Sequence, residues 1–320
     1  MKPSLLNKLI CPQCATPLLI SASQENAAEI RKGLLNCLKA GHIYKIENGI
    51  PGLVFGLDEE SQKEQDVCEK DSQVRVARPE LSREWLLGLP GTYVQQLTSS
   101  AEAYNNGDIE CIFNQMISTF PLPQGQHLLD IGANVCWSTR VFAKIGYEAT
   151  ALDFVTAPLR GLESADVYMQ ADGIFFERVQ ANMEKLPFKN ESYDLIFSIS
   201  TIHHSGNLEK LFLEMHRILK TGGKAIIADS TIGWLIRNSQ EKHIEEMHHH
   251  GLNDHAYRYR DFMQAIKKAG FKIQLLFPQS TIRKYSLLRV FPDFLRLWLL
   301  PALHVVRGLG FVAILTKETR

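Results

Sequence analysis

The stretch His127-Leu-Leu-Asp-Ile-Gly-Ala-Asn134 decides the fold of this 320-residue chain. Its apolar residues predict a short buried strand, and Gly132 predicts a tight turn where the backbone can approach a ligand. A helical pattern over 138–145 follows, and the free N–H groups at its start can face a carboxylate or a phosphate. A second apolar run, 149–153, ends at Asp153, where a carboxylate can hold two ribose hydroxyls.

Outward from this stretch, short apolar runs alternate with helical patterns up to the end of the chain. We expect further strands at 193–199, 224–228, 271–277 and 310–316, and helices at 208–219 and 260–269. Strands that are separated by helices of about ten residues predict a doubly wound, mostly parallel α/β sheet with helices on both faces.

Composition divides the chain into three parts. Residues 1–57 contain a cluster of cysteines, 58–79 are acidic with little apolar content, and 80–320 have a globular pattern. We therefore predict a small N-terminal module, a solvated linker and one larger domain. The 35 basic and 35 acidic side chains cancel, so the net charge does not point towards nucleic acid, although a local basic patch is not excluded by it.

The start of the chain lacks the apolar core and the cleavage site of a signal peptide. Six cysteines are too few for a disulfide scaffold, and no uncharged apolar run reaches the length of about 18 residues that a spanning helix needs. A cytoplasmic protein is the expectation that follows.

Several motifs occur in the order and spacing of class I S-adenosylmethionine-dependent methyltransferases. They are 128–134, Asp153, Asn182-Met-Glu-Lys-Leu-Pro-Phe188, Ser192-Tyr-Asp194, Ile202-His-His204 and Glu214-Met-His-Arg-Ile-Leu-Lys-Thr-Gly-Gly223. Over about residues 125–230 the chain resembles the subfamily that includes ubiquinone, sterol and natural-product methyltransferases. The resemblance implies a seven-stranded Rossmann-like sheet, S-adenosylmethionine as cofactor, and a small-molecule or lipid-like methyl acceptor.

The same resemblance implies which residues contact the cofactor. They are Asp130, Gly132, Asn134, Asp153, Asn182, Met183 and Ser200. In this scheme Asp130 and Gly132 border the methionine end, Asp153 takes the ribose hydroxyls, Asn182 and Met183 flank the adenine, and 198–200 face the transferable methyl.

Two departures from the family pattern bear on this scheme. Asn134 and Cys136 stand where glycines are usual, so the loop could be held differently. Asn182 replaces a more common Asp, although its amide oxygen can still accept the adenine amino hydrogen. The rival class, nicotinamide enzymes, is disfavoured because the turn lacks the sequence G-x-G-x-x-G.

The N-terminal cysteines predict a metal site. Cys11-Pro-Gln-Cys14 is a C-x2-C knuckle, and Cys37 with His42 would complete a tetrahedral structural zinc site of three thiolates and one imidazole. The surrounding sequence, over about 5–55, resembles the small zinc-ribbon protein that activates several methyltransferases. Ala40 stands where that family commonly has its fourth cysteine, so the role of His42 is an inference, and chance cysteines in a turn are the plainer alternative.

Three histidines are candidate catalytic residues. His203 and His204 follow the fourth strand of the predicted sheet, where one of them could remove a proton from the acceptor or serve only the structure. The run 247–255 is dense in histidine, and it has three readings: a lid from which His255 reaches in as a base, a metal site, or a solvated helix end.

The segment 281–307 is an apolar, basic insertion before the last strand. It could lie on a membrane surface or form a wall of a lipophilic acceptor pocket, and it could equally be a packing cap or an oligomer contact. Because Pro292 and Pro301 interrupt it, two or three short helices are expected rather than one long helix.

Methyl transfer to a small-molecule or lipid-like acceptor is the leading functional hypothesis. An RNA methyltransferase is the first alternative, because a bacterial ribosomal-RNA guanine methyltransferase family also combines a zinc module with this fold. A cofactor-binding scaffold without catalysis is the second alternative. The sequence leaves the acceptor and the oligomeric state open.

Overall fold

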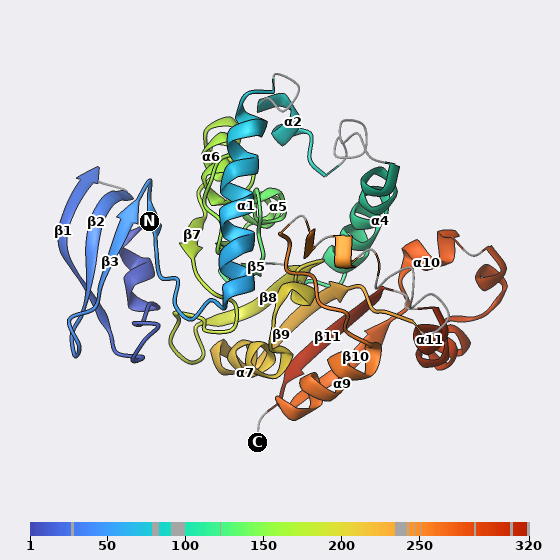
Figure 1. Ribbon diagram of the computed structural model, residues 1–320. Coiled ribbons are helices and arrows are strands. Elements are labelled where there is room, and N and C mark those ends of the chain that lie inside the picture. The colour runs from blue at the N-terminus through green and yellow to red at the C-terminus, as the bar shows by residue number, and fades with distance from the viewer. Residues whose placement is uncertain are drawn as a thin grey trace.

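The computed structural model describes most of the chain, and its two parts lie side by side in Figure 1. The described residues are 1–26, 29–78, 83–90, 100–121, 123–233, 242, 244–246, 248–249, 251–284, 286–307 and 310–318. Met247 and His250 of the histidine run, and residue 79 of the predicted linker, lie outside them. A small antiparallel sheet forms the N-terminal part, and a larger α/β layer structure forms the rest.

The larger part is built on a seven-stranded sheet in the order β10-β11-β9-β8-β5-β6-β7. Its strands are β5 (His127–Ile131), β6 (Glu148–Asp153), β7 (Glu177–Gln180), β8 (Tyr193–Ile199), β9 (Leu219–Asp229), β10 (Phe271–Leu276) and β11 (Phe311–Lys317). Strand β11 is antiparallel to both neighbours, and the other pairs are parallel. The predicted mostly parallel sheet is confirmed. The strand order reverses beside β5, where open α/β sheets bind ligands.

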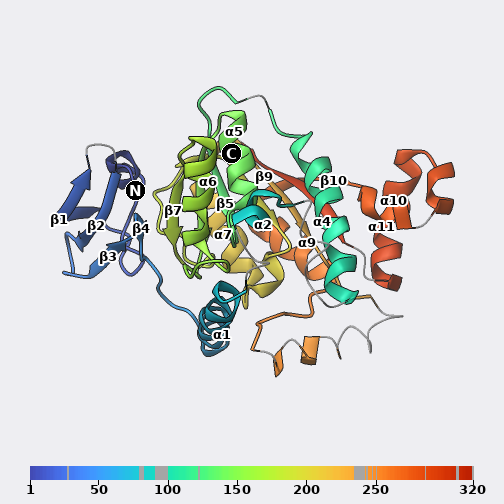
Figure 2. The same ribbon diagram turned by 90° about the horizontal axis from the view of Figure 1, so that it is seen from above.

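Helices cover both faces of this sheet (Figure 2). They are α2 (Arg83–Leu87), α4 (Ser100–Ile117), α5 (Trp137–Ile145), α6 (Ala165–Asp172), α7 (Leu208–Ile218) and α9 (Tyr259–Lys268), with short 3-10 turns η2 (Leu162–Ser164) and η3 (Ile202–His204). The alternation of side chains along each strand produces two cores. Leu129 of β5 packs in the core with α7 and α9, whereas Leu128 packs in the core with α2, α4, α5 and α6.

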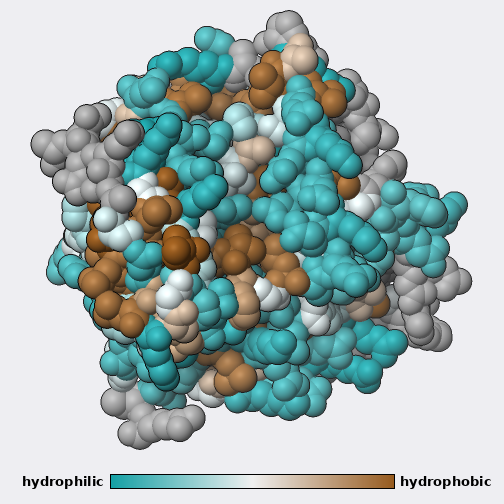
Figure 3. Space-filling view, turned by 60° about the vertical axis from the view of Figure 1, so that its left-hand side comes forward, coloured by the Kyte–Doolittle hydropathy of each residue, from teal (hydrophilic) through white to brown (hydrophobic). Residues whose placement is uncertain are grey.

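The N-terminal module consists of η1 (Pro3–Asn7) and the antiparallel strands β1 (Leu18–Asn26), β2 (Glu29–Cys37), β3 (Ile43–Glu47) and β4 (Ile50–Pro51). It joins the edge of the large sheet at β7, where the Leu53 amide donates to the Gln180 carbonyl over 2.8 Å. Arg178 of β7 is 1% exposed and lies between Asp166 at 2.7 Å and Glu29 of the module at 3.3 Å. Figure 3 turns this side of the molecule forward and shows hydrophobic residues gathered in a band at its left and centre.

The predicted linker differs most from the structure, because Glu59–Val76 forms an 18-residue helix, α1. Asp58 caps its start by accepting a hydrogen bond from the Ser61 amide over 2.8 Å. Its buried residues are Glu64, Cys68 and Ser72, one turn apart on a single face. A helix whose buried stripe is polar shows no hydrophobic period, so the sequence pattern does not reveal it.

The segment before the last strand forms α10 (Gln279–Lys284), η4 (Ser286–Val290) and α11 (Asp293–Arg307). The expected division into short helices is found, but Pro301 was expected to end a helix and lies inside α11, which continues with one hydrogen bond fewer. In Figures 1 and 2 these helices lie beyond β10, at the end of the sheet away from the N-terminal module. None of the described helices has the length and apolar character that crossing a membrane requires.

Candidate cofactor and acceptor site

The turn after β5 keeps a left-handed backbone at three alternate residues. The φ angles are 73° at Gly132, 46° at Asn134 and 65° at Cys136. A Cβ atom on Gly132 would lie 2.0 Å from Cγ2 of Thr201, so only glycine fits there. Asn134 and Cys136 therefore adopt the conformation that glycine usually provides. Asparagine tolerates it well, whereas for cysteine it costs roughly 1–2 kcal/mol.

Asp130, the acidic residue near the end of β5, connects this strand to the first residues of α5. Its Oδ2 accepts hydrogen bonds from the hydroxyls of Ser138 and Thr139, both over 2.6 Å. Burial raises the pKa of Asp130 to about 6, although the two hydroxyls oppose that shift. Asp130 was expected to border the cofactor, but it fastens the strand to the start of α5 and does not line the cavity described below.

Asp153 ends β6 beside this turn. Its Oδ2 accepts from the Asn134 amide over 2.8 Å and its Oδ1 accepts from the Val155 amide over 2.9 Å. Burial raises the pKa of Asp153, while these backbone hydrogen bonds lower it. Each oxygen keeps a second lone pair, so the carboxylate is fixed in place and can accept two further hydrogen bonds.

These residues border a cavity of about 220 Å³ at the carboxyl ends of β5 and β6. It is lined by Glu64, Cys68, Gly132, Asn134, Leu152, Asp153, Phe154, Val155, Arg160, Ala181, Met183, Ser200, Thr201, His204 and Leu252. Five of the seven cofactor residues named from the sequence are among them, together with His204. Glu64 and Cys68 were missed because α1 was expected to be a solvated linker.

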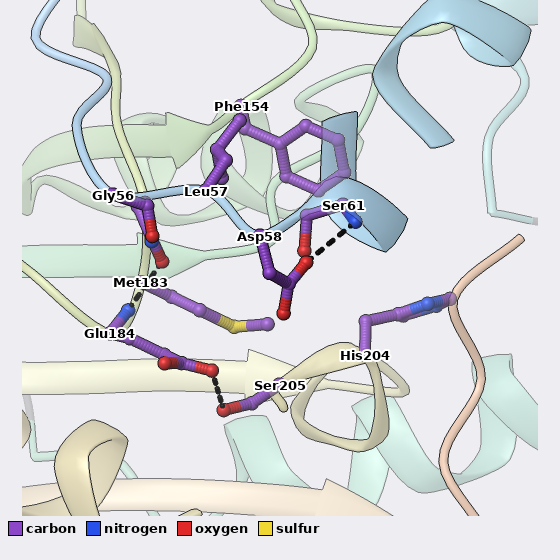
Figure 4. A pocket seen from close by; sticks show the side chains of 10 residues that line it. Gly56, Leu57, Asp58, Ser61, Phe154, Met183, Glu184, His204 and Ser205 are labelled. Atoms are coloured by element: carbon purple, nitrogen blue, oxygen red, sulfur yellow. Dashed lines mark hydrogen bonds between the residues drawn. The ribbon is translucent and has the colours of Figure 1, made fainter. Parts of the chain in front are cut away.

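A second pocket, of about 20 Å³, adjoins the cavity and shares Met183 with it. Figure 4 shows the side chains of Asp58, Met183 and His204 around this pocket. Asn182 also lines it, but its amide donates to the Gly56 carbonyl over 3.0 Å and accepts from the Glu184 amide over 2.8 Å. The side chain expected to contact adenine thus fastens the chain that leaves the N-terminal module to the rim of the cavity.

His203 and His204 lie side by side in η3, with ring centres 4.3 Å apart. His203 Nδ1 lies 2.7 Å from Asp229 Oδ1. Burial lowers the pKa of His203, but Asp229 outweighs it and raises the value to about 9. His204 is the histidine that lines the cavity, and burial together with the charge of His203 lowers its pKa.

The described histidines of the run 247–255 do not line the cavity, although Leu252 of the same run does. His248 and His249 are exposed, and His248 Nε2 lies 2.6 Å from the Asp254 carbonyl oxygen. His255 is half-buried, its amide donates to the His203 carbonyl over 2.9 Å, and burial lowers its pKa. It is absent from both cavity linings.

The predicted zinc ligands come together in the N-terminal module. One ligand atom from each of Cys11, Cys14, Cys37 and His42 lies within 4.8 Å of all the others. Cys14 Sγ and Cys37 Sγ are 3.3 Å apart, and so are Cys11 Sγ and His42 Nδ1. A hydrogen bond from the Thr16 hydroxyl lowers the pKa of Cys37 to about 5. Three thiolates and one imidazole are a donor set that zinc takes, and the sulfur separation of about 3.8 Å in a tetrahedron of 2.3 Å Zn–S bonds falls within the 4.8 Å span of these atoms.

The turn, the fixed carboxylate and the cavity lie together at the reversal of strand order. Residues 129–227 match the family model described as a methyltransferase domain. The family model covers about a third of the chain.

Two curated methyltransferases are similar to parts of this chain. A sarcosine/dimethylglycine N-methyltransferase of Aphanothece halophytica is 36% identical over 109 residues, which are 33% of this chain and 39% of that protein. Squalene methyltransferase 1 of Botryococcus braunii is 25% identical over 208 residues, or 62% of this chain and 52% of that protein. The chain thus spans about half or less of these relatives.

A phosphoethanolamine N-methyltransferase 2 of Haemonchus contortus, solved with S-adenosyl-L-methionine, superposes with a TM-score of 0.52. It is 17% identical, and the match covers 93% of this chain and 71% of that one. At this identity the likeness shows a shared fold.

Proposed function

We propose that the chain transfers a methyl group from S-adenosylmethionine to a small-molecule or lipid-like acceptor. The observation that carries the proposal is Asp153, whose two oxygens are fixed by backbone amides at the wall of the cavity. Such a carboxylate suits a vicinal diol like that of a ribose. The methyltransferase domain match over 129–227 supports the same reaction.

Each residue of the cavity wall is assigned one part of the cofactor according to its position. Asp153 would hold the ribose, and the turn at Gly132 and Asn134 would let the methionine part approach the backbone. Met183 would pack on the adenine. When bound, the cofactor supplies an electrophilic methyl group. Methyl transfer is an in-line displacement, so the chain has mainly to orient the acceptor.

Of the three candidate histidines, His204 is the one placed to contact an acceptor, because it lines the cavity. His203 lies behind it and is held by Asp229, so we assign it no direct contact with the acceptor. His255 is assigned no contact with the acceptor, because it lies outside both linings.

Calorimetry with S-adenosylhomocysteine tests the cofactor site. Asp153→Ala is expected to weaken binding by roughly 1–3 kcal/mol through loss of charge-assisted hydrogen bonds. Asp153→Asn keeps the shape of the side chain and separates the loss of charge from a shift of the turn. Glu148→Ala, on the other end of β6 with a side chain 64% exposed, is the control and is expected to bind like the parent. Equal affinity in all variants would refute the placement of the ribose.

We also propose that Cys11, Cys14, Cys37 and His42 hold one structural zinc ion. Metal analysis of the purified protein is expected to find that zinc, and Cys14→Ser is expected to lose it and to unfold the module at a lower temperature. Cys68→Ser, at a cysteine outside the cluster, is the control. If His42→Ala retains the zinc, the proposed site stands and only the assignment of its fourth ligand is wrong.

Contact of 281–307 with a membrane surface is part of the proposal, because aromatic side chains of this segment face solvent. Phe294 and Trp298 are each 74% exposed, and Val290 is 76% exposed. No described residue of 281–307 lines the cavity, so we do not propose the segment as a wall of the acceptor pocket.

A further inference from the structure

Two imidazoles and two carboxylates meet at the wall of the cavity, where Glu64 of α1 faces His204 of η3. His204 Nδ1 lies 3.3 Å from Asp254 Oδ1 and 3.4 Å from Glu64 Oε1. His203 Nε2 lies 3.8 Å from the same Asp254 oxygen. One donor atom from each of His203, His204 and Asp254 lies within 4.8 Å of the other two. The four side chains come from three separate segments of the chain.

These spacings suit a metal ion. Bonds of about 2.1 Å from a divalent ion to nitrogen or oxygen place neighbouring ligand atoms about 3.0 Å apart in an octahedron and about 3.4 Å apart in a tetrahedron. The contacts of Asp254 Oδ1 and Glu64 Oε1 with His204 Nδ1 fall at these values. Two histidines and one carboxylate with open positions form a recurrent ligand set for divalent transition metals.

His203 is already oriented as a ligand. Its Nδ1 is held by Asp229, which is fully buried, so its Nε2 is the nitrogen that faces Asp254. A carboxylate on the far nitrogen of a metal-binding histidine fixes the ring and its tautomer. Asp254 and Glu64 are two further carboxylates close to these imidazoles, and a divalent cation would pair with them.

Glu64 supplies an independent observation. It is 5% exposed, and its Oε2 has no hydrogen-bond partner in the described parts of the chain. A buried carboxylate oxygen without a partner costs free energy unless something binds it. Because Glu64 borders both the cluster and the cavity, an ion beside it would also be open to a bound acceptor.

We propose that His203, His204, Asp254 and Glu64 bind a divalent first-row transition metal ion at the wall of the cavity. The ion keeps open coordination positions towards the cavity. There it binds a hydroxyl oxygen of the acceptor and lowers its pKa, so that the proton passes to water and the oxygen takes the methyl group from the sulfonium. This role rests on the proposed methyl transfer, whereas binding of the ion does not. The site is separate from the N-terminal cysteine site in place and in ligand type.

Mn²⁺ is the probe that separates the two sites, because it prefers oxygen and nitrogen ligands to thiolates. Titration of the full chain, with free Mn²⁺ measured by electron paramagnetic resonance, is expected to give one site. Asp254→Asn and Glu64→Gln are each expected to weaken it at least tenfold. Cys14→Ser and Asp66→Asn, the latter on the exposed side of α1, are expected to leave it unchanged.

Each outcome decides one question. If the Cys14→Ser variant, which lacks the cysteine site, binds neither Mn²⁺ nor Zn²⁺, the metal proposal is wrong. If Asp254→Asn and Glu64→Gln bind Mn²⁺ as tightly as the parent, the ion lies elsewhere and the proposal is also wrong. Calorimetry with S-adenosylhomocysteine on the same samples reports on the cofactor site alone. Mn²⁺ binding without cofactor binding therefore refutes the methyl transfer and leaves the metal site standing.

Discussion

Helix α1 and the segment 279–307, which comprises α10, η4 and α11, differ in composition and in their position relative to the cavity. Helix α1 is acidic and polar, yet Glu64 and Cys68 line the cavity. The segment 279–307 is apolar and basic, yet it packs near α4 and α9 at the far end of the sheet. Strand β10, which leads into it, lies four positions from β5, so strand spacings of about 4.8 Å place it roughly 19 Å away.

The comparison shows that apolar content does not locate the side of the sheet where ligands bind. Helix α1 attaches through hydrogen bonds from polar side chains to backbone carbonyls after β6. Gln65 Nε2 donates to the Phe154 carbonyl over 3.0 Å, and Ser72 Oγ donates to the Pro158 carbonyl over 2.6 Å. These contacts hold the helix over the cavity without an apolar stripe.

Proline substitutions give the largest expected contrast between the two regions. Gln65→Pro places a proline inside α1, and Leu297→Pro places one inside α11. Each substitution destabilises its helix by about 3 kcal/mol or more. Gln65→Pro is expected to weaken binding of S-adenosylhomocysteine at least tenfold because the cavity loses one wall. Leu297→Pro is expected to change the affinity less than twofold. Calorimetry gives both affinities.

Circular dichroism on the same samples is the control, since both variants must keep the α/β domain. Equal losses of affinity in the two variants would contradict the different roles assigned to these helices. A normal affinity in Gln65→Pro would mean that α1 covers the cavity without contributing to binding.

Six of the seven strands of the large sheet, together with α5, α7 and α9, could be predicted from the sequence because their buried faces are apolar and periodic. Strand β7 and helices α2, α4 and α6 were not predicted. The predicted strands at 193–199 and 127–131 coincide with β8 and β5. Helix α1 could not be predicted in this way, since its buried positions are Glu64, Cys68 and Ser72. A pattern of apolar residues carries no information on a helix that packs through polar contacts.

Residues of the cavity wall were predictable where they stand at the end of a strand. Asp153 ends β6, Gly132 follows β5 and Ser200 follows β8, and all three line the cavity. Asp130 and Asn182 were expected to contact the cofactor because they stand in the motifs of the resembled family. Their side chains instead form hydrogen bonds with hydroxyls and a backbone carbonyl of the chain itself. Asp254 and Glu64 come from distant segments, and only the fold brings them to His204.

A smaller effect is expected from a single polar contact of α1. Ser72→Ala removes the hydroxyl that donates to the Pro158 carbonyl, which costs about 0.5–1.5 kcal/mol, and the higher helix propensity of alanine returns about 0.5 kcal/mol. The free energy of unfolding is thus expected to fall by up to about 1 kcal/mol in a denaturant titration. Gln73→Ala, on the exposed side of the same helix, is expected to stay within about 0.5 kcal/mol. A loss of the same size in both would show that α1 is not held by this hydrogen bond.

The smallest effects on stability and cofactor affinity are expected at the exposed apolar side chains of 279–307. Trp298→Ser removes a side chain that is 74% exposed, so the free energy of unfolding is expected to change by less than about 0.5 kcal/mol. Binding to vesicles is the property that should change, because a tryptophan inserted at a lipid surface removes apolar area from water. Co-sedimentation with vesicles that contain anionic phospholipid is expected to show binding of the parent and about fivefold weaker binding of Trp298→Ser. Leu213→Ser, at a side chain of α7 that is 53% exposed, should bind like the parent. A parent that stays in the supernatant would contradict the membrane contact and leave 279–307 as a packing element beyond β10.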